Sequence, residues 1–122
     1  MSDAIFITGL LIHAHHGVMR HETKVGQQFA IDLELAIDLA RAGASDKLVD
    51  TVSYASIVEA ATRAFTAKSF RLVEAAAQAI ADEVLAAFPR VASVRVTVHK
   101  PHAPIAAIFN DVGVTILRTR GA

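Results

Sequence analysis

The stretch that decides the fold is VRVTVHKPHAPI, residues 94–105. Strand side chains alternate between two faces, so the three valines lie on one face and the polar residues between them on the other. Lys100 shares the apolar face, and Pro101 ends the strand because proline cannot donate to a sheet ladder. We expect a lysine at the rim of a buried surface, where a strand meets a loop. An ordinary lysine whose stem covers apolar surface explains the same pattern.

Similar periodicities predict the remaining elements. Alternating or continuous apolar runs indicate strands, and apolar residues spaced every three or four positions indicate helices. The predicted elements are strands 4–13 and 29–38, helices 55–66 and 72–88, and strands 91–100 and 111–118. Segments 15–27 and 42–50 are polar and are interpreted as loops. The order is ββααββ.

This order predicts an α+β fold, an antiparallel four-stranded sheet with both helices on one face. The opposite face carries Asp32 and Glu34 on one strand and Arg95 and Thr97 on another, so it is polar and charge-matched. Two open sheet edges favour association. Joining sheets edge to edge into a closed barrel removes the edges and encloses the polar face, so we expect a homo-oligomer.

Composition limits the function classes. A chain of 122 residues with 53% hydrophobic residues suits one domain, which we place at residues 1–122. Twelve basic and twelve acidic residues give no net charge, so neither nucleic acid nor a membrane is an expected partner. The absence of cysteine excludes disulfides and thiolate metal sites. The apolar segment 4–14 has no basic region before it and is too short for a bilayer, so a cytoplasmic location is predicted.

Four ionisable residues stand at the ends of predicted elements: Glu22, Tyr54, Glu74 and Lys100. Glu74 falls in the first turn of a helix, where the helix dipole favours an acidic residue. Its carboxylate is also suited to accept two parallel hydrogen bonds from a planar, amidine-like edge. A 2-amino-4-oxo-pteridine or a guanine presents such an edge. Both interpretations of Glu74 are open at this point.

In these residues the chain resembles the dihydroneopterin aldolases of folate biosynthesis. The resemblance extends from the first strand through Arg118. It is carried by His16-Gly17 before Glu22, Gly26-Gln27, Ser45-Asp46, Asp50 to Tyr54, Leu72-Val73-Glu74, and Lys100 to Ile105. It implies a tunnelling fold of ββααββ subunits, in which four subunits close a barrel and two such rings form an octamer. It also implies active sites between neighbouring subunits.

The resemblance further implies a role for each residue. Glu74 would bind the 2-amino and N3 edge of a pterin, helped by backbone groups near Val73. Glu22 and Lys100 would face the trihydroxypropyl tail and N5. Thr51, Val52 and Tyr54 would come from the adjacent subunit. The remaining expected substrate-binding residues are Leu72, Ser53, His16 and Ile105.

The implied reaction is the retro-aldol cleavage of 7,8-dihydroneopterin, catalysed by a carbon–carbon lyase. The pterin ring would accept the electrons of the broken bond, so neither a Schiff base nor a metal or other cofactor is expected. Lys100 would act as general acid and base, and Tyr54 would reprotonate the enamine carbon. The six histidines show no standard ligand spacing, which argues against a metal site.

Two alternatives remain open. Epimerisation at C2′ uses the same cleavage followed by re-addition of the aldehyde, and in some family members it acts on the triphosphate. Only Arg20, Lys24 and Lys100 lie near enough to bind such a tail, so the unphosphorylated substrate is favoured. The second alternative is a catalytically silent barrel that binds a pterin or a purine. Such a protein has little use for a proton-transfer lysine.

Overall fold

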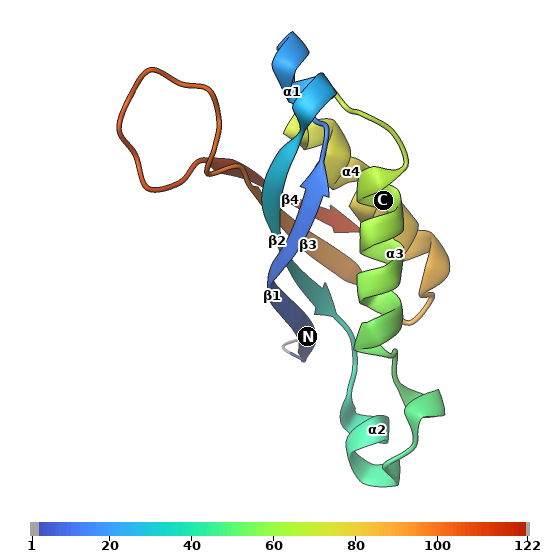
Figure 1. The fold of residues 1–122 in the computed structure, drawn as a ribbon. Coiled ribbons are helices and arrows are strands. Elements are labelled where there is room, and N and C mark those ends of the chain that lie inside the picture. Colours follow the sequence, from blue (N-terminus) through green and yellow to red (C-terminus); the bar gives the residue numbers. More distant parts are fainter. Residues whose placement is uncertain (1–2, 122) are drawn as a thin grey trace.

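Four antiparallel strands pair in chain order in the computed structural model, which describes residues 3–121 (Figure 1). They are β1 (Ala4–Ala14), β2 (Gln27–Ala36), β3 (Ser93–His99) and β4 (Gly113–Thr119). Two longer helices, α3 (Tyr54–Thr66) and α4 (Val73–Ala87), lie between β2 and β3 in the sequence. The predicted α+β class and the order of the main strands and helices are confirmed.

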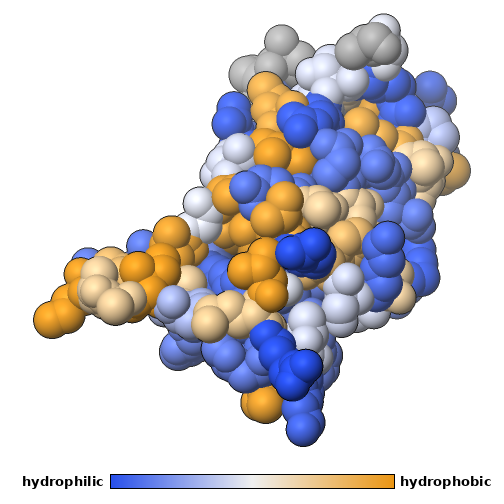
Figure 2. Space-filling view, turned by 90° about the horizontal axis from the view of Figure 1, so that it is seen from above, coloured by the Kyte–Doolittle hydropathy of each residue, from blue (hydrophilic) through white to orange (hydrophobic). Residues whose placement is uncertain are grey.

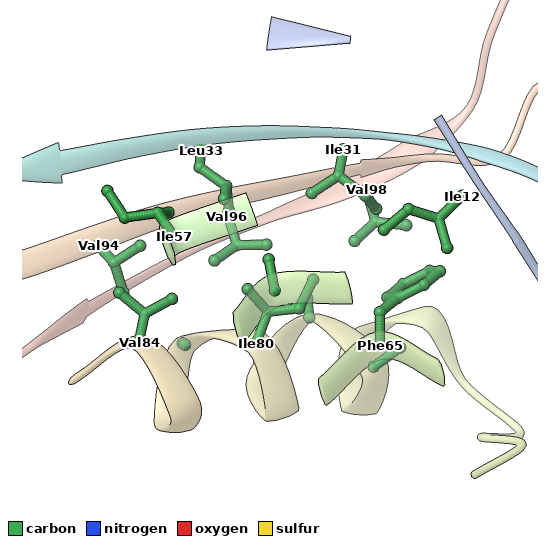
Figure 3. Close-up of a cluster of buried hydrophobic side chains, with 14 of the residues drawn as sticks. Ile12, Ile31, Leu33, Ile57, Phe65, Ile80, Val84, Val94, Val96 and Val98 are labelled. Atoms are coloured by element: carbon green, nitrogen blue, oxygen red, sulfur yellow. The ribbon is translucent and has the colours of Figure 1, made fainter. Parts of the chain in front are cut away.

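The core lies between one face of the sheet and the two longer helices (Figure 3). Alternate side chains of β2 and β3 point into it, and Ile57, Phe65, Ile80 and Val84 meet them from α3 and α4. All four of these helix residues are fully buried. Burial of an aliphatic or aromatic side chain stabilises the fold by about 1.5–3 kcal/mol. The alternation in the sequence therefore determines which face of the sheet the helices cover.

The other face of the sheet is polar, as the sequence predicts. Arg95 on β3 faces Glu34 on β2, with 3.8 Å between Nε and Oε1. The hydroxyls of Thr97 and Thr115 lie 2.8 Å apart across β3 and β4. Strand β2 ends at Ala36, two residues before the predicted end at Asp38.

Three short helices occupy segments that we predicted as loops. They are α1 (Arg20–Val25), α2 (Ala40–Ser45) and the 3₁₀ helix η1 (Leu48–Asp50). Each is at most six residues long, too short to show a helical periodicity in the sequence. The predicted continuous first strand is also irregular, because its pairing register with β2 shifts between Ile7 and Leu10. Gly9 has φ +70° there and donates its N–H to Oδ1 of Asp32 at 2.8 Å.

The segment between β3 and β4 projects from the sheet as a wide loop, drawn in orange in Figure 1. Its surface is largely hydrophobic in Figure 2, where it forms the protrusion at the left. Ile108 is fully exposed there and Ile105 is about half exposed. Across the described part of the chain, no helix combines the length and the apolarity needed to span a bilayer.

Candidate active site

Lys100 follows the last residue of β3 and forms an ion pair with Glu22 of α1. Its Nζ lies 2.6 Å from Oε2 of Glu22, and the two side chains are 14% and 2% exposed. The Lys100 N–H donates to the carbonyl of Val112 at 2.7 Å, which fixes the backbone at the base of the wide loop. Lys100 thus lies at the rim of the buried surface, as predicted, and its ammonium group is held inside the protein.

The carboxylate of Glu22 is held from several sides. It accepts hydrogen bonds from the Met19 N–H at 3.2 Å and from Nε2 of Gln27 at 3.3 Å, besides the contact with Lys100. Burial alone would raise the pKa of Glu22, but the bonds from Lys100 and Met19 outweigh burial and lower it. Glu22 is therefore ionised at neutral pH, and its negative charge pairs with the positive charge of Lys100.

Gly17 and Gln27 shape this pair, and sequence reasoning gave neither of them a role. A Cβ on Gly17 would lie 2.3 Å from the carboxyl carbon of Glu22, and the residue has φ +148°. Only glycine therefore fits beside the carboxylate. The Oε1 of Gln27 is buried and has no hydrogen-bond partner among residues 3–121, and Nε2 of the same side chain contacts Glu22. The feature of the sequence that could have revealed both residues is their place in the family motifs His16-Gly17 and Gly26-Gln27.

His16 does not lie where a substrate contact was expected. Its side chain is 1% exposed, and both ring nitrogens are bonded to backbone groups of the same chain. Nε2 lies 2.8 Å from the carbonyl of Phe65, and Nδ1 accepts the Phe70 N–H at 3.0 Å. No nitrogen of the ring is left for a pterin. This geometry favours a structural role for His16 over direct contact with a substrate.

The expected pterin anchor is exposed at the start of α4. Glu74 lies in the first turn of this helix, and Leu72 at the N-cap position is 53% exposed. Backbone N–H groups of a first helical turn lack helical partners, so this end of α4 offers donors beside the carboxylate of Glu74. Val73 is half-buried between them.

Ile105 lies in the wide loop, whereas Thr51 to Tyr54 lie at the start of α3, the end of this helix nearer α2 in Figure 1. Tyr54 begins α3 and is 71% exposed, whereas Phe65, which His16 contacts, lies in its last turn. At 1.5 Å per residue, these two positions are roughly 16 Å apart along the helix. One chain therefore does not bring Tyr54 to Lys100.

A cavity of about 400 Å³ lies at this second end. Its lining is Thr51, Val52, Ser53, Ser56, Ala87, Phe88, Pro89 and Arg90. Asp50, which directly precedes Thr51 and is 7% exposed, accepts the Ser45 hydroxyl at 2.6 Å and faces Arg41 Nε at 3.1 Å. Three of the expected binding residues thus line one hollow, away from Glu22, Glu74 and Lys100.

A separate cluster lies on the polar face of the sheet, beside Lys100. His99 places Nε2 2.7 Å from Asp32 and Nδ1 2.5 Å from Asp111. Hydrogen bonds with Asp32 and then Asp111 outweigh burial and raise the pKa of His99. The sequence contained one signal for this cluster, since His99 alternates onto the face that carries Asp32. Among residues 3–121, no three His, Asp or Glu side chains are arranged to hold a metal ion.

A family model described as dihydroneopterin aldolase matches residues 5–117. The chain belongs to the dihydroneopterin aldolase family. The dihydroneopterin aldolase of Methylorubrum extorquens is 44% identical over 120 residues, which cover 98% of this chain and 92% of that protein. The structure of Escherichia coli dihydroneopterin aldolase in complex with neopterin has a TM-score of 0.86 at 35% identity. The matched region covers 95% of this chain and 98% of the Escherichia coli chain.

A third dihydroneopterin aldolase, from Burkholderia, was solved with bound guanine. It has a TM-score of 0.78 at 25% identity and covers 97% of this chain and 91% of that one. The tunnelling fold expected from the sequence is thus confirmed by members of the same family. A Bacillus uricase with a TM-score of 0.68 at 12% identity shares the fold alone.

Proposed function

We propose that this member of the dihydroneopterin aldolase family cleaves 7,8-dihydroneopterin into 6-hydroxymethyl-7,8-dihydropterin and glycolaldehyde, a step of folate biosynthesis. The observation that carries the proposal is the buried Lys100–Glu22 ion pair at the end of β3. A buried charged pair is costly to the fold and is a common feature of catalytic sites. The relatives named dihydroneopterin aldolase, one of them holding neopterin, support the same reaction.

In this proposal the ammonium of Lys100 protonates N5 of the pterin, and the resulting amine then takes the proton of the 2′-hydroxyl. The bond between C1′ and C2′ breaks, glycolaldehyde leaves, and the electron pair passes into the ring as an enamine. Tyr54 donates a proton to C1′, and the N5 proton then passes to the phenolate, directly or through water, which restores the C6=N5 bond and the phenol. Glu22 holds the Lys100 side chain in place through the ion pair at the start of the cycle.

Substrate binding in this proposal begins at the start of α4. Glu74 accepts the 2-amino and N3 hydrogens of the ring, as a carboxylate accepts an arginine fork, and backbone groups of Leu72 and Val73 bind the neighbouring ring edge. Ile105 in the wide loop covers the ring. The relatives solved with neopterin and with guanine support this assignment, because both ligands carry the same planar edge.

The complete site is proposed to form between two copies of the chain. Tyr54 and the hollow lined by Thr51, Val52 and Ser53 lie at the opposite end of α3 from the Lys100 end, so a second copy must supply them. The outer strands β1 and β4 and the exposed apolar loop give each copy surfaces to bury. We propose that the whole chain forms one domain, that four copies close a barrel, alone or stacked as an octamer, and that the enzyme works in the cytoplasm.

The test is to incubate chelator-treated protein with 7,8-dihydroneopterin and to measure glycolaldehyde and 7,8-dihydromonapterin together. The proposal expects the aldehyde as the main product, with activity unaffected by the chelator. Monapterin alone would identify an epimerase, and neither product would identify a binding protein without catalysis. A borohydride-trapped imine on Lys100 would contradict the acid–base mechanism.

A further inference from the structure

Two adjacent residues after β1, His16 and Gly17, form hydrogen bonds with the connection between α3 and α4. The Phe70 N–H donates to Nδ1 of His16 at 3.0 Å, and the Phe70 carbonyl accepts the Gly17 N–H at 2.9 Å. Both backbone groups of Phe70 are thus bonded to adjacent residues of one segment. Phe70 precedes Val73, the first residue of α4, by only three positions, so its placement determines where the exposed start of α4 lies.

The ring of His16 can make both of its hydrogen bonds, to Phe65 and to Phe70, in only one protonation state. Nδ1 accepts the Phe70 N–H, so Nε2 must carry the hydrogen that is donated to the Phe65 carbonyl. The rings of Phe29, Phe65 and Phe70 surround it, with centroids 5.5, 4.5 and 5.3 Å away. Burial, and then the nearby His15 and Lys100, lower the pKa of His16 despite the bond to Phe65. The neutral Nε2–H tautomer is the form that satisfies both bonds.

The same segment also touches the ion pair. Gly17 lies so close to the carboxylate of Glu22 that a Cβ there would be 2.3 Å from its carboxyl carbon, and Oε2 of the same carboxylate contacts Lys100. The Lys100–Glu22 pair and the start of α4 are therefore joined through His16 and Gly17. No other backbone hydrogen bond from the β1–α1 connection reaches the α3–α4 connection among residues 3–121.

We propose that His16 is a positioning residue, which sets the place of the Glu74 anchor relative to the Lys100–Glu22 pair through its bond to the Phe70 N–H. The inference rests on the proposed function, because Glu74 and Lys100 have these roles only in pterin cleavage. His16 itself does not touch the substrate. A ring deep among three phenylalanines acts on the site only through the backbone that it holds.

Two substitutions separate the two bonds of the ring. In His16→Asn the amide oxygen takes the place of Nδ1 and keeps an acceptor for the Phe70 N–H, but the donor to Phe65 is lost. In His16→Gln the amide nitrogen reaches the place of Nε2 and keeps the donor to Phe65, but the acceptor for Phe70 is lost. The two variants thus lose one hydrogen bond each, in the same pocket.

The measurements are the thermal unfolding temperature, the Kd for neopterin, and kcat and KM for 7,8-dihydroneopterin. We expect similar destabilisation of both variants but a roughly tenfold higher Kd and KM for His16→Gln alone, the usual effect of one hydrogen bond on an equilibrium. Its kcat at saturation should change much less, because the Lys100–Glu22 pair is intact. Hydrogen exchange at the Phe70 amide should become faster in His16→Gln than in His16→Asn.

Equal Kd values for the two variants, or a loss confined to kcat, would overturn the positioning role while leaving the proposed function standing. Failure of the unmodified protein to bind neopterin or to release glycolaldehyde would overturn the proposed function, and this inference with it. If both variants unfold, the imidazole nitrogen resonances of the unmodified protein decide the question. A ring with hydrogen on Nε2 and none on Nδ1 at neutral pH supports the role of Nδ1 as acceptor, and a hydrogen on Nδ1 contradicts it.

Discussion

The two ends of helix α3 differ in how fully one chain satisfies its own polar groups. At the Phe65 end, His16 and Glu22 are buried and bonded, and Lys100 is paired inside the protein. At the Tyr54 end, the phenol is 71% exposed and the neighbouring residues line an open hollow of about 400 Å³. Apart from Oε1 of Gln27, the polar groups named at the first end are bonded within one chain, whereas the second end is open to solvent.

This difference separates the parts of the proposed reaction. Proton transfer depends on accurate placement, and a group held by several hydrogen bonds is placed before the substrate arrives. Such placement is supplied at the Lys100 end by contacts within one chain. In the proposed assembly a neighbouring copy places the Tyr54 end, so the contribution of Tyr54 should depend on assembly and the placement of Lys100 should not.

The largest expected effect comes from removing the ammonium group. Lys100→Met should lower kcat by roughly 10²- to 10⁴-fold, the usual contribution of a positioned acid–base group. The Kd for neopterin should stay near that of the unmodified protein, because the ring is bound at α4. Steady-state kinetics and a fluorescence titration with neopterin give the two values.

The control concerns stability. Lys100→Met leaves the buried charge of Glu22 unpaired, which costs about 3–5 kcal/mol of unfolding free energy when a buried pair is broken. The double variant Lys100→Met/Glu22→Gln removes that charge and should recover most of the stability without recovering kcat. Near-normal kcat in a folded single variant would contradict the role of Lys100.

A smaller effect is expected from the anchor. Glu74→Gln keeps the shape of the side chain but replaces charge-assisted hydrogen bonds by neutral ones, so the Kd for neopterin should rise about tenfold or more. Thermal stability should change little, since Glu74 is exposed in the free chain and only its favourable interaction with the helix dipole is lost. An unchanged Kd would show that the ring binds elsewhere.

The dependence on a second copy is tested by mixing two defective chains. Lys100→Met and Tyr54→Phe chains, unfolded together and refolded as a mixture, should recover activity at roughly one site in four, since each shared site draws one residue from each neighbour. Each variant refolded alone should remain inactive. A mixture no more active than its components would show that Tyr54 and Lys100 do not act in a common site.

The sequence predicted the parts of the molecule that depend on local patterns. Alternation placed Ile31, Leu33 and the valines of β3 in the core, and the proline after Lys100 marked the end of the strand. The pairing of Lys100 with Glu22 was not readable in this way. It depends on α1, whose six residues have no periodic signal, and on a contact across 78 positions of the chain.

His16 and His99 illustrate the same limit. Both were visible as histidines near family motifs, but their roles depend on partners far away in the sequence. His16 is bonded to Phe65 and Phe70, and His99 to Asp32 and Asp111. The packing of α3 and the α3–α4 connection against the end of β1 brings the partners of His16 to it, and the sheet and the loop between β3 and β4 bring those of His99. Gly113 contributes, because a Cβ there would lie 2.1 Å from the carbonyl oxygen of Val98.

The smallest expected effect is on the pH dependence of stability at the Lys100 end. The pKa of His16 is lowered from 6.5, so its contribution is present above pH 6.5 and is lost as pH falls toward the folded-state pKa. The pKa of His99 is raised from 6.5, so its contribution is complete below pH 6.5 and is lost as pH rises through the folded-state pKa. Stability should therefore decline on both sides of a maximum.

Urea unfolding of the unmodified protein and of His99→Gln from about pH 5 to about pH 9 separates the two contributions. The variant should be less stable by about 0.5–1 kcal/mol on the acid side, the usual value for partly exposed ion pairs, with the difference disappearing at alkaline pH. The acid-side decline due to His16 should persist, because its ring is buried and bonded to other partners. A difference in unfolding free energy that grows with pH would mean that Asp32 and Asp111 stabilise the neutral ring of His99. That result would contradict the charged form of the cluster beside Lys100.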